Sequence, residues 1–187
     1  MSSNRTLVLP SITAGVAAMT VIVTASNFLV QFPINDWLTW GALTYPVAFL
    51  VTDLTNRRLG ARSARRVVYV GFALAVLLSA ILATPRIAIA SGSAFLVAQL
   101  LDIVVFNRLR RARWWQAPLV SSTLGSIVDT ALFFSLAFAG TGVPWVTLAI
   151  GDLGVKLAMA LLMLIPFRLL LAATAPVGRT AASDATP

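Results

Sequence analysis

Most aspartates of this chain lie in apolar segments, where burying a charge costs free energy. All six acidic residues are aspartates, and four of them stand in or at the ends of long apolar segments: Asp53, Asp102, Asp129 and Asp152. A charge at the centre of a membrane helix costs about 2.5–3.5 kcal/mol on insertion scales, so it is retained where it is paired or functional. A carboxylate there can pair with a cation, hold a proton or accept hydrogen bonds from a ligand. We therefore expect the function to depend on these residues.

Asp129 lies in a predicted helix over residues 117–140. Ser122, Gly125 and Asp129 recur at three- and four-residue spacing, so they share one face of that helix. At 1.5 Å per residue, Asp129 falls near the middle of the span, about twelve residues in. It is either satisfied by a neighbouring helix or faces a ligand at the midplane, where transporters of small solutes place their sites. The second interpretation is favoured.

Asp152 and Lys156 are four residues apart in the last apolar segment. In a helix they face the same way, with the acid N-terminal to the base, which is the better order for an ion pair. A structural bridge and a role in binding or gating are equally compatible with this spacing. Lys156 lies at a depth similar to Asp129, so the two aspartates compete for it, and a substrate could switch the arrangement.

The other two buried acids lie nearer the ends of their segments. Asp102 precedes the run Asn107-Arg108, and either pairs with a loop arginine or contributes to the same site as Asp129. Asp53 lies four residues before Arg57, a spacing that predicts a local ion pair. Asn27 is either an interfacial polar residue or part of an outer gate, and the sequence does not decide between them.

The composition excludes several classes of function. The chain is 59% hydrophobic and 11% charged, with a mean hydropathy of +0.91, whereas a soluble domain carries about 25% charged residues. It has no cysteine and no histidine, which excludes thiol and Ser-His-Asp chemistry and metal sites built from Cys or His. No GxxxxGK[ST] loop is present. We predict a membrane protein that is not an enzyme and needs no metal or cofactor.

Six segments are long enough to cross a bilayer, which needs about 20 helical residues. They span residues 8–31, 38–56, 67–84, 86–107, 117–140 and 143–171. The prediction is an all-α bundle of six transmembrane helices over residues 1–171, followed by a disordered cytoplasmic tail at 172–187. Pro46 is expected to kink the second helix.

The basic residues predict the orientation. In the six-helix arrangement, twelve of the fourteen fall on one side, namely Arg5, Arg57, Arg58, Arg62, Arg65, Arg66, Arg108, Arg110, Arg111, Arg113, Arg168 and Arg179. The positive-inside rule then places both termini in the cytoplasm. The same rule explains the net charge of +8 through short membrane loops, so nucleic-acid binding is not predicted. The expected location is the inner membrane, with the lipid bilayer as partner. A homo-oligomer is left open.

Three stretches resemble one known family. They are TYPVAFLVTDLTNRRLGARSARRVVYVGF (44–72), AQLLDIVVFNRLRRARWWQAPLVSSTLGSIVDTALFF (98–134) and GDLGVKL (151–157). Together they resemble the queuosine precursor transporter family, also called vitamin uptake transporter-like. The resemblance implies a six-helix inner-membrane importer of 7-deazaguanines, namely 7-cyano-7-deazaguanine or 7-aminomethyl-7-deazaguanine, for the queuosine modification of tRNA. The chain's short turn at 84–86 departs from longer members.

The resemblance also implies a set of substrate-binding residues. They are Asp129, Asp102, Lys156, Asp152, Asn107, Asp53, Asn56 and Ser122. A deazaguanine presents adjacent N–H and NH₂ donors that one carboxylate can accept together, and Asp129 is the first choice for this role, with Asp102 next. Lys156 or Asn107 would meet the acceptors of the base. Its flat ring would stack on an aromatic side chain, with Phe95, Phe106, Phe133 and Tyr45 as candidates.

Two other functions compete with this prediction. The chain could be the substrate-binding subunit of an energy-coupling-factor transporter, which would need separate ATPases. It could also be an intramembrane aspartyl enzyme using Asp102 and Asp129, but the sequence around them lacks the YD and GxGD motifs of such proteases. The sequence leaves the preferred precursor open, and does not distinguish proton coupling from facilitated diffusion.

Overall fold

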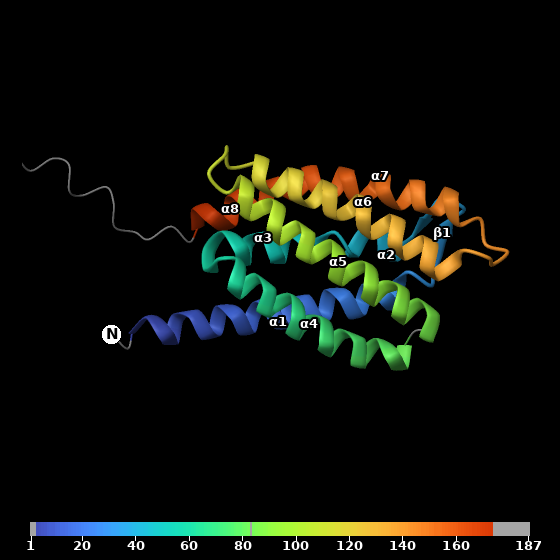
Figure 1. The fold of residues 1–187 in the computed structure, drawn as a ribbon, viewed down its shortest axis with the longest axis horizontal. Helices are drawn as coiled ribbons and strands as arrows, with labels where there is room; N and C mark the ends of the chain where they lie inside the picture. Colours follow the sequence, from blue (N-terminus) through green and yellow to red (C-terminus); the bar gives the residue numbers. More distant parts are fainter. Residues whose placement is uncertain (1–2, 83, 174–187) are drawn as a thin grey trace, which may run out of the picture.

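The computed structural model describes residues 3–82 and 84–173, and these are almost entirely helical (Figure 1). The elements, in chain order, are α1 (Ser3–Leu29), β1 (Pro33–Asn35), β2 (Leu38–Thr39), α2 (Trp40–Thr44), α3 (Val47–Leu59), α4 (Ala61–Leu82), α5 (Pro85–Leu109), α6 (Gln116–Phe138), α7 (Trp145–Leu162) and α8 (Leu164–Ala173). The predicted all-α class is confirmed for the described residues. The one exception is the short antiparallel hairpin β1–β2, which the sequence analysis did not predict.

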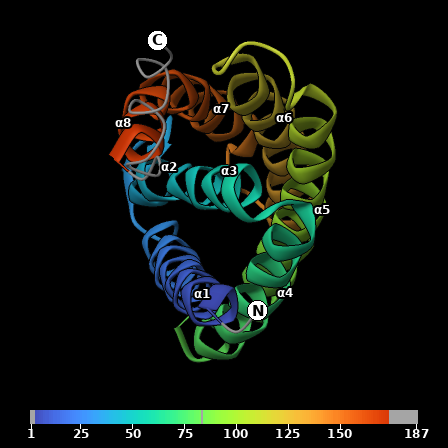
Figure 2. The ribbon, with the colours of Figure 1, turned by 90° about the vertical axis from the view of Figure 1, so that its left-hand side faces the viewer.

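The helices run roughly along one axis and pack as neighbouring pairs. α5 lies along α6, α1 along α4, and α7 along α6. Figure 2 looks along the long axis and shows α3 between the α1–α4 pair and the α6–α7 pair. α3 therefore contacts helices on several sides, and its polar residues lie inside the bundle, where Thr52, Asp53 and Asn56 are all buried.

Two of the predicted spans are broken helices. The second is divided into α2 and α3 at Tyr45-Pro46, which confirms the kink expected at Pro46, because proline cannot donate to the preceding turn. The last predicted span, 143–171, is divided into α7 and α8 at Met163. Pro166 lies in the first turn of α8 and lacks the N–H that would bond back to Leu162, so the helix is interrupted there, while Trp145–Leu171 is still one candidate span.

Within the residues that the structure describes, four helical segments are long and apolar enough to cross a membrane by length and composition. They are Ile12–Leu29, Pro85–Leu109, Gln116–Phe138 and Trp145–Leu171. α3 has only 13 residues and is too short to cross by itself. The protein is thus a multi-pass, all-α membrane protein, and six crossings remain a prediction.

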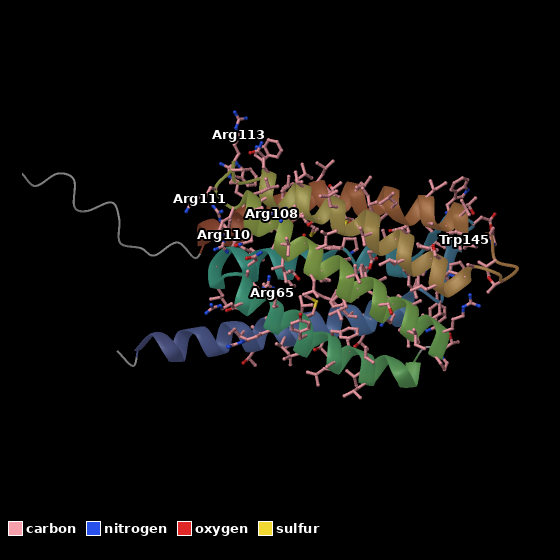
Figure 3. All side chains as sticks on the ribbon, in the orientation of Figure 1. Arg65, Arg108, Arg110, Arg111, Arg113 and Trp145 are labelled. Atoms are coloured by element: carbon pink, nitrogen blue, oxygen red, sulfur yellow. The ribbon has the colours of Figure 1, made fainter. Side chains whose placement is uncertain are left out.

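Five loop and helix-end arginines and Trp145 lie at opposite ends of the long axis (Figure 3). Figure 3 shows Arg65, Arg108, Arg110, Arg111 and Arg113 at the end of the molecule where α8 lies, and Trp145 at the opposite end. The start of α1 also lies toward the arginine-rich end (Figure 1). This arrangement is the one that the positive-inside prediction requires. The predicted tail and Arg179 lie outside the described residues.

A close helix contact sets the position of α6 against α3. A Cβ on Gly125 would lie 2.6 Å from Cε1 of Phe49, so only glycine allows this approach without displacing the ring. Asp129 is one turn further along the same face of α6 and is also buried. The Gly125 contact therefore brings the carboxylate-bearing face of α6 toward the interior of the bundle.

Candidate functional site

Three charged side chains meet in the middle of the bundle. Nζ of Lys156, on α7, lies 2.7 Å from Oδ2 of Asp129 on α6 and 2.5 Å from Oδ2 of Asp152, one turn earlier on α7. The Lys156 side chain is only 3% exposed. The predicted Asp152–Lys156 pair is confirmed. Asp129 has a partner on a neighbouring helix, which is the alternative that the sequence analysis did not favour, and a ligand-binding role for it stays a prediction. We call these three residues the charged cluster.

Hydroxyl groups complete the hydrogen bonding of the cluster. The Tyr45 hydroxyl donates to Oδ1 of Asp129 at 2.8 Å, and Oγ1 of Thr130 donates to Oδ2 of Asp152 at 2.8 Å. Lys156 also donates to Thr130 Oγ1 at 3.1 Å, and its Nζ lies 5.0 Å from the centre of the Tyr45 ring. Two carboxylates share one ammonium group, so the ionised cluster has one more negative charge than positive. A ligand with N–H donors or a positive charge would complement it.

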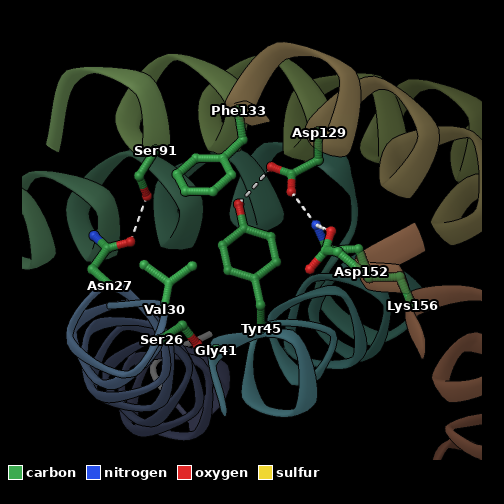
Figure 4. A pocket seen from close by; sticks show the side chains of 10 residues that line it. All are labelled: Ser26, Asn27, Val30, Gly41, Tyr45, Ser91, Asp129, Phe133, Asp152 and Lys156. Atoms are coloured by element: carbon green, nitrogen blue, oxygen red, sulfur yellow. Dashed lines mark hydrogen bonds and ion pairs between the residues drawn. The ribbon is translucent and has the colours of Figure 1, made fainter. Parts of the chain in front are cut away.

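The charged cluster forms one wall of a small, partly open pocket. Figure 4 shows the ten lining residues, with the Tyr45 ring between the cluster and α1 and its hydroxyl directed at Asp129. Phe133 supplies a second aromatic ring. We call this the Asp129 pocket. It offers carboxylate acceptors beside two aromatic rings, which is the combination that a flat heterocycle with an N–H edge would need.

The far side of the Asp129 pocket is polar as well. Ser91, on α5, donates to Oδ1 of Asn27 on α1 at 2.5 Å, and the hydroxyls of Ser26 and Thr44 lie 2.8 Å apart. Sequence reasoning named Asn27 without a role and missed Ser26 and Ser91. The polar pair Ser26-Asn27 interrupts an apolar helix and could have drawn attention to this region. The sequence did not indicate that this part of α1 would contact α5.

A second, smaller pocket lies next to the first along the bundle. Its polar lining consists of Asp53, Ser122, Ser126 and Lys156, and Phe49 and Phe167 supply aromatic rings. We call it the Asp53 pocket. Asp53 is buried, and accepts hydrogen bonds from the hydroxyls of Ser122 at 3.2 Å and Ser121 at 3.4 Å. Lys156 lines both pockets and separates them.

The ion pair expected between Asp53 and Arg57 is not formed. Arg57 instead donates through Nη1 to the backbone carbonyl of Arg110 at 2.7 Å, while Asp53 faces the serines of α6. The helix directs Asp53 into the bundle and lets the longer arginine reach the polar loop after α5. Burial, together with the charge of Arg57, lowers the pKa of Arg110 below its usual range.

The remaining predicted residues line neither pocket. Asp102 is fully buried on α5, where its carboxyl group lies beside Asp53 and Ser121. No loop arginine pairs with it in the part of the chain that the structure describes, so that alternative was wrong. Phe106 packs edge-on against Phe167 at a centroid distance of 6.3 Å, and Asn107 is exposed. Among the described residues, no group of three metal-ligating side chains comes together.

Comparisons with known proteins agree with this architecture. Two overlapping parts of the chain, residues 39–84 and 79–171, match the family described as "Putative vitamin uptake transporter". A Haemophilus influenzae protein named "Probable queuosine precursor transporter" is 37% identical, over 78% of this chain and 79% of that protein. An Escherichia coli "Queuosine precursor transporter" is 35% identical, with the same coverage of 78% and 79%. The chain belongs to the queuosine precursor transporter family.

A more distant relative in the family is a Bacillus subtilis protein named "Probable queuosine precursor transporter", which is 26% identical over 67% of this chain and 68% of that protein. No solved structure matches the chain significantly. The matched segments of the transporter family contain the whole charged cluster and every residue of the Asp53 pocket. Ser26, Asn27 and Val30 of α1 lie before those segments, so part of the Asp129 pocket comes from outside the family match.

Proposed function

We propose that this protein imports a 7-deazaguanine precursor of queuosine across the inner membrane for tRNA modification. The substrate is 7-cyano-7-deazaguanine, 7-aminomethyl-7-deazaguanine or both. Six helical crossings carry it, with both termini in the cytoplasm. One observation carries the proposal furthest. Asp129, Asp152 and Lys156 form a buried charged cluster beside two aromatic rings, in a chain whose relatives are named for queuosine precursors.

The chemistry of the Asp129 pocket suits the edge of a deazaguanine. The base presents adjacent N–H and NH₂ donors, and an ionised carboxyl group has about four lone-pair positions. Tyr45 and Lys156 each use one oxygen of Asp129, which leaves acceptor capacity on both. The hydrogen bonds that reach Asp152 go to Oδ2, and no described residue donates to its Oδ1. The donor edge of the base can therefore bind without a new buried charge.

The remaining features of the base match other lining residues. Lys156 is a donor for the ring carbonyl, and its present partners are the two carboxylates that the base would engage. Tyr45 and Phe133 offer ring faces, and stacking on an aromatic side chain is worth about 1–3 kcal/mol per base. The space is narrow, so a bicyclic ring enters only when these side chains move. The broken helix at Tyr45-Pro46 allows such movement, as in transporters with discontinuous helices.

The proposed site residues have different structural support. Asp129, Asp152 and Lys156 belong to the Asp129 pocket, and Asp53 and Ser122 to the Asp53 pocket. Asp102, Asn107 and Phe106 line neither pocket and are proposed from the sequence alone.

Uptake in cells tests the proposal. A bacterial strain that cannot make the precursor and lacks its own importer would express this chain and receive labelled nitrile, amine or free-base forms. We expect queuosine in tRNA with the wild-type chain and none with Asp129→Asn. Asp36→Asn is the matched control, because Asp36 is exposed in the β1–β2 hairpin. Absence of uptake for all three forms would overturn the assignment. Uptake by the purified protein in liposomes would exclude the energy-coupling-factor alternative.

A further inference from the structure

The two pockets are consecutive along the same three helical segments. On α6, the Asp129 pocket uses Asp129 and Phe133, and the Asp53 pocket uses the preceding turns through Ser122 and Ser126. On α7, both use Lys156, from which the Asp53 pocket continues toward α8. The break in the second predicted span divides them in the same way, with Tyr45 in one pocket and Pro46 in the other. The pockets therefore follow one another along the long axis.

The pockets offer similar chemistry. Each has a buried carboxylate that accepts hydroxyl donors: Asp129 from Tyr45, and Asp53 from Ser121 and Ser122. Each has two aromatic rings in its lining. A planar ligand with an N–H edge would find an acceptor and an aromatic surface in either one.

Asp53 has no cationic partner among the described residues, and its polar neighbours are the Asp102 carboxyl group and the hydroxyls of Ser121 and Ser122. Among the described residues the salt bridges all belong to Lys156, and neither joins it to Asp53. On either side of Asp53, hydrogen bonds join α3 to α5. Thr52 donates to the side-chain oxygen of Gln99 at 2.6 Å, and Asn56 donates to the backbone carbonyl of Ile103 at 3.3 Å. A buried carboxyl group held in place without a counterion is costly, and donors from a ligand would offset that cost.

Lys156 is the side chain that separates the two pockets. Its ammonium is held by Asp129 and Asp152, and it lies in the lining of both cavities. Moving from these acids toward Asp53 would keep the ammonium paired and would join the two spaces. Lysine suits this role because its charge is carried on a flexible four-carbon stem.

We propose that the Asp53 pocket is a second binding station for the same planar base, on the arginine-rich side of the Asp129 pocket, and that Lys156 is the gate between the two stations. The proposal rests on the proposed import function. A base received at Asp129 displaces the ammonium of Lys156, which swings toward Asp53. The base then passes to Asp53 as the ammonium returns to Asp129 and Asp152.

The absence of native cysteine allows a direct test by single-cysteine labelling. Val30→Cys reports on the Asp129 pocket and Ser126→Cys on the Asp53 pocket, with Ala160→Cys as a second reporter there. Membrane-impermeant thiol reagents would be applied from each side of oriented vesicles, with and without 7-cyano-7-deazaguanine. Thr141→Cys and Ala112→Cys, in exposed loops at opposite ends, calibrate the two sides.

We expect Val30→Cys to label from the side of Thr141→Cys, and Ser126→Cys from the side of Ala112→Cys. The base should slow labelling several-fold at both reporters and at neither loop. Adding Lys156→Ala should make Ser126→Cys reachable from both sides. Protection at Val30→Cys but at neither Ser126→Cys nor Ala160→Cys, with uptake intact, would overturn the second station alone. No protection at any reporter and no uptake would overturn the import function as well.

Discussion

Lys156 Nζ and Asp129 Oδ2 lie 2.7 Å apart between α7 and α6, and both side chains are buried. Asp152 shares the same ammonium group, so one lysine pairs with two acids. Removing one member of a buried ion pair leaves an uncompensated charge, which is far more costly than never having the pair. The cluster is thus both the proposed binding site and a point on which the stability of the bundle depends.

Lys156→Met is expected to destabilise the protein strongly, by about 3–5 kcal/mol, because both carboxylates lose their cation. Thermal unfolding of the purified protein in detergent would measure the loss. The double variant Lys156→Met/Asp152→Asn should recover part of it, since one buried charge is removed along with its partner. Equal stability of the wild type and Lys156→Met would contradict the ion-paired cluster.

Tyr45→Phe tests the hydroxyl that positions Asp129. The variant keeps the aromatic ring and loses a hydrogen bond to a charged group, which is worth about 1.5–3 kcal/mol. We expect substrate affinity to weaken on the order of tenfold, and Tyr45→Leu to weaken it further by removing the ring. Calorimetric titration would measure both variants. Tyr69→Phe is the matched control, because Tyr69 is 47% exposed, and a loss of the same size there would contradict the role of Tyr45.

Gly151→Ala tests how the β1–β2 hairpin is seated on α7. A Cβ at Gly151 would lie 2.0 Å from the carbonyl oxygen of Trp37, so the hairpin has to move, whereas a Cβ at Gly154 meets no atom within 4 Å. We expect Gly151→Ala to lower the unfolding temperature. Gly154→Ala should leave it unchanged or raise it, because alanine is favoured over glycine in a helix by about 1 kcal/mol. Identical behaviour of the two variants would show that the hairpin does not pack as described.

Local patterns in the sequence predicted the local parts of this structure. The spacing of Asp152 and Lys156 predicted their ion pair, and Pro46 predicted the break before α3. Both depend on a few neighbouring residues of one helix. The break at Met163 had the same kind of signal in Pro166 and was missed because the residues on both sides of it are apolar.

Contacts between distant helices could not be predicted in the same way. Tyr45 and Asp129 are 84 residues apart, and Ser91 and Asn27 are 64 apart. Which polar faces contact one another depends on how the helices pack, and helix packing cannot be derived from residue spacing in a single sequence. Asp53 is an example of a wrong local prediction. Its spacing to Arg57 predicted an ion pair within one helix, whereas helix packing places it against Ser121 and Ser122 of α6.

The most direct test of the import function and of the role of Asp129 is uptake of labelled 7-cyano-7-deazaguanine by liposomes that contain only this purified protein. We predict that liposomes with the wild type or Asp36→Asn take up the base. Liposomes with Asp129→Asn should not, although this variant unfolds at a temperature similar to that of the wild type. Full uptake by Asp129→Asn would contradict the proposed site. If the folded wild type neither takes up nor binds the nitrile, amine or free-base form, the import function itself is wrong.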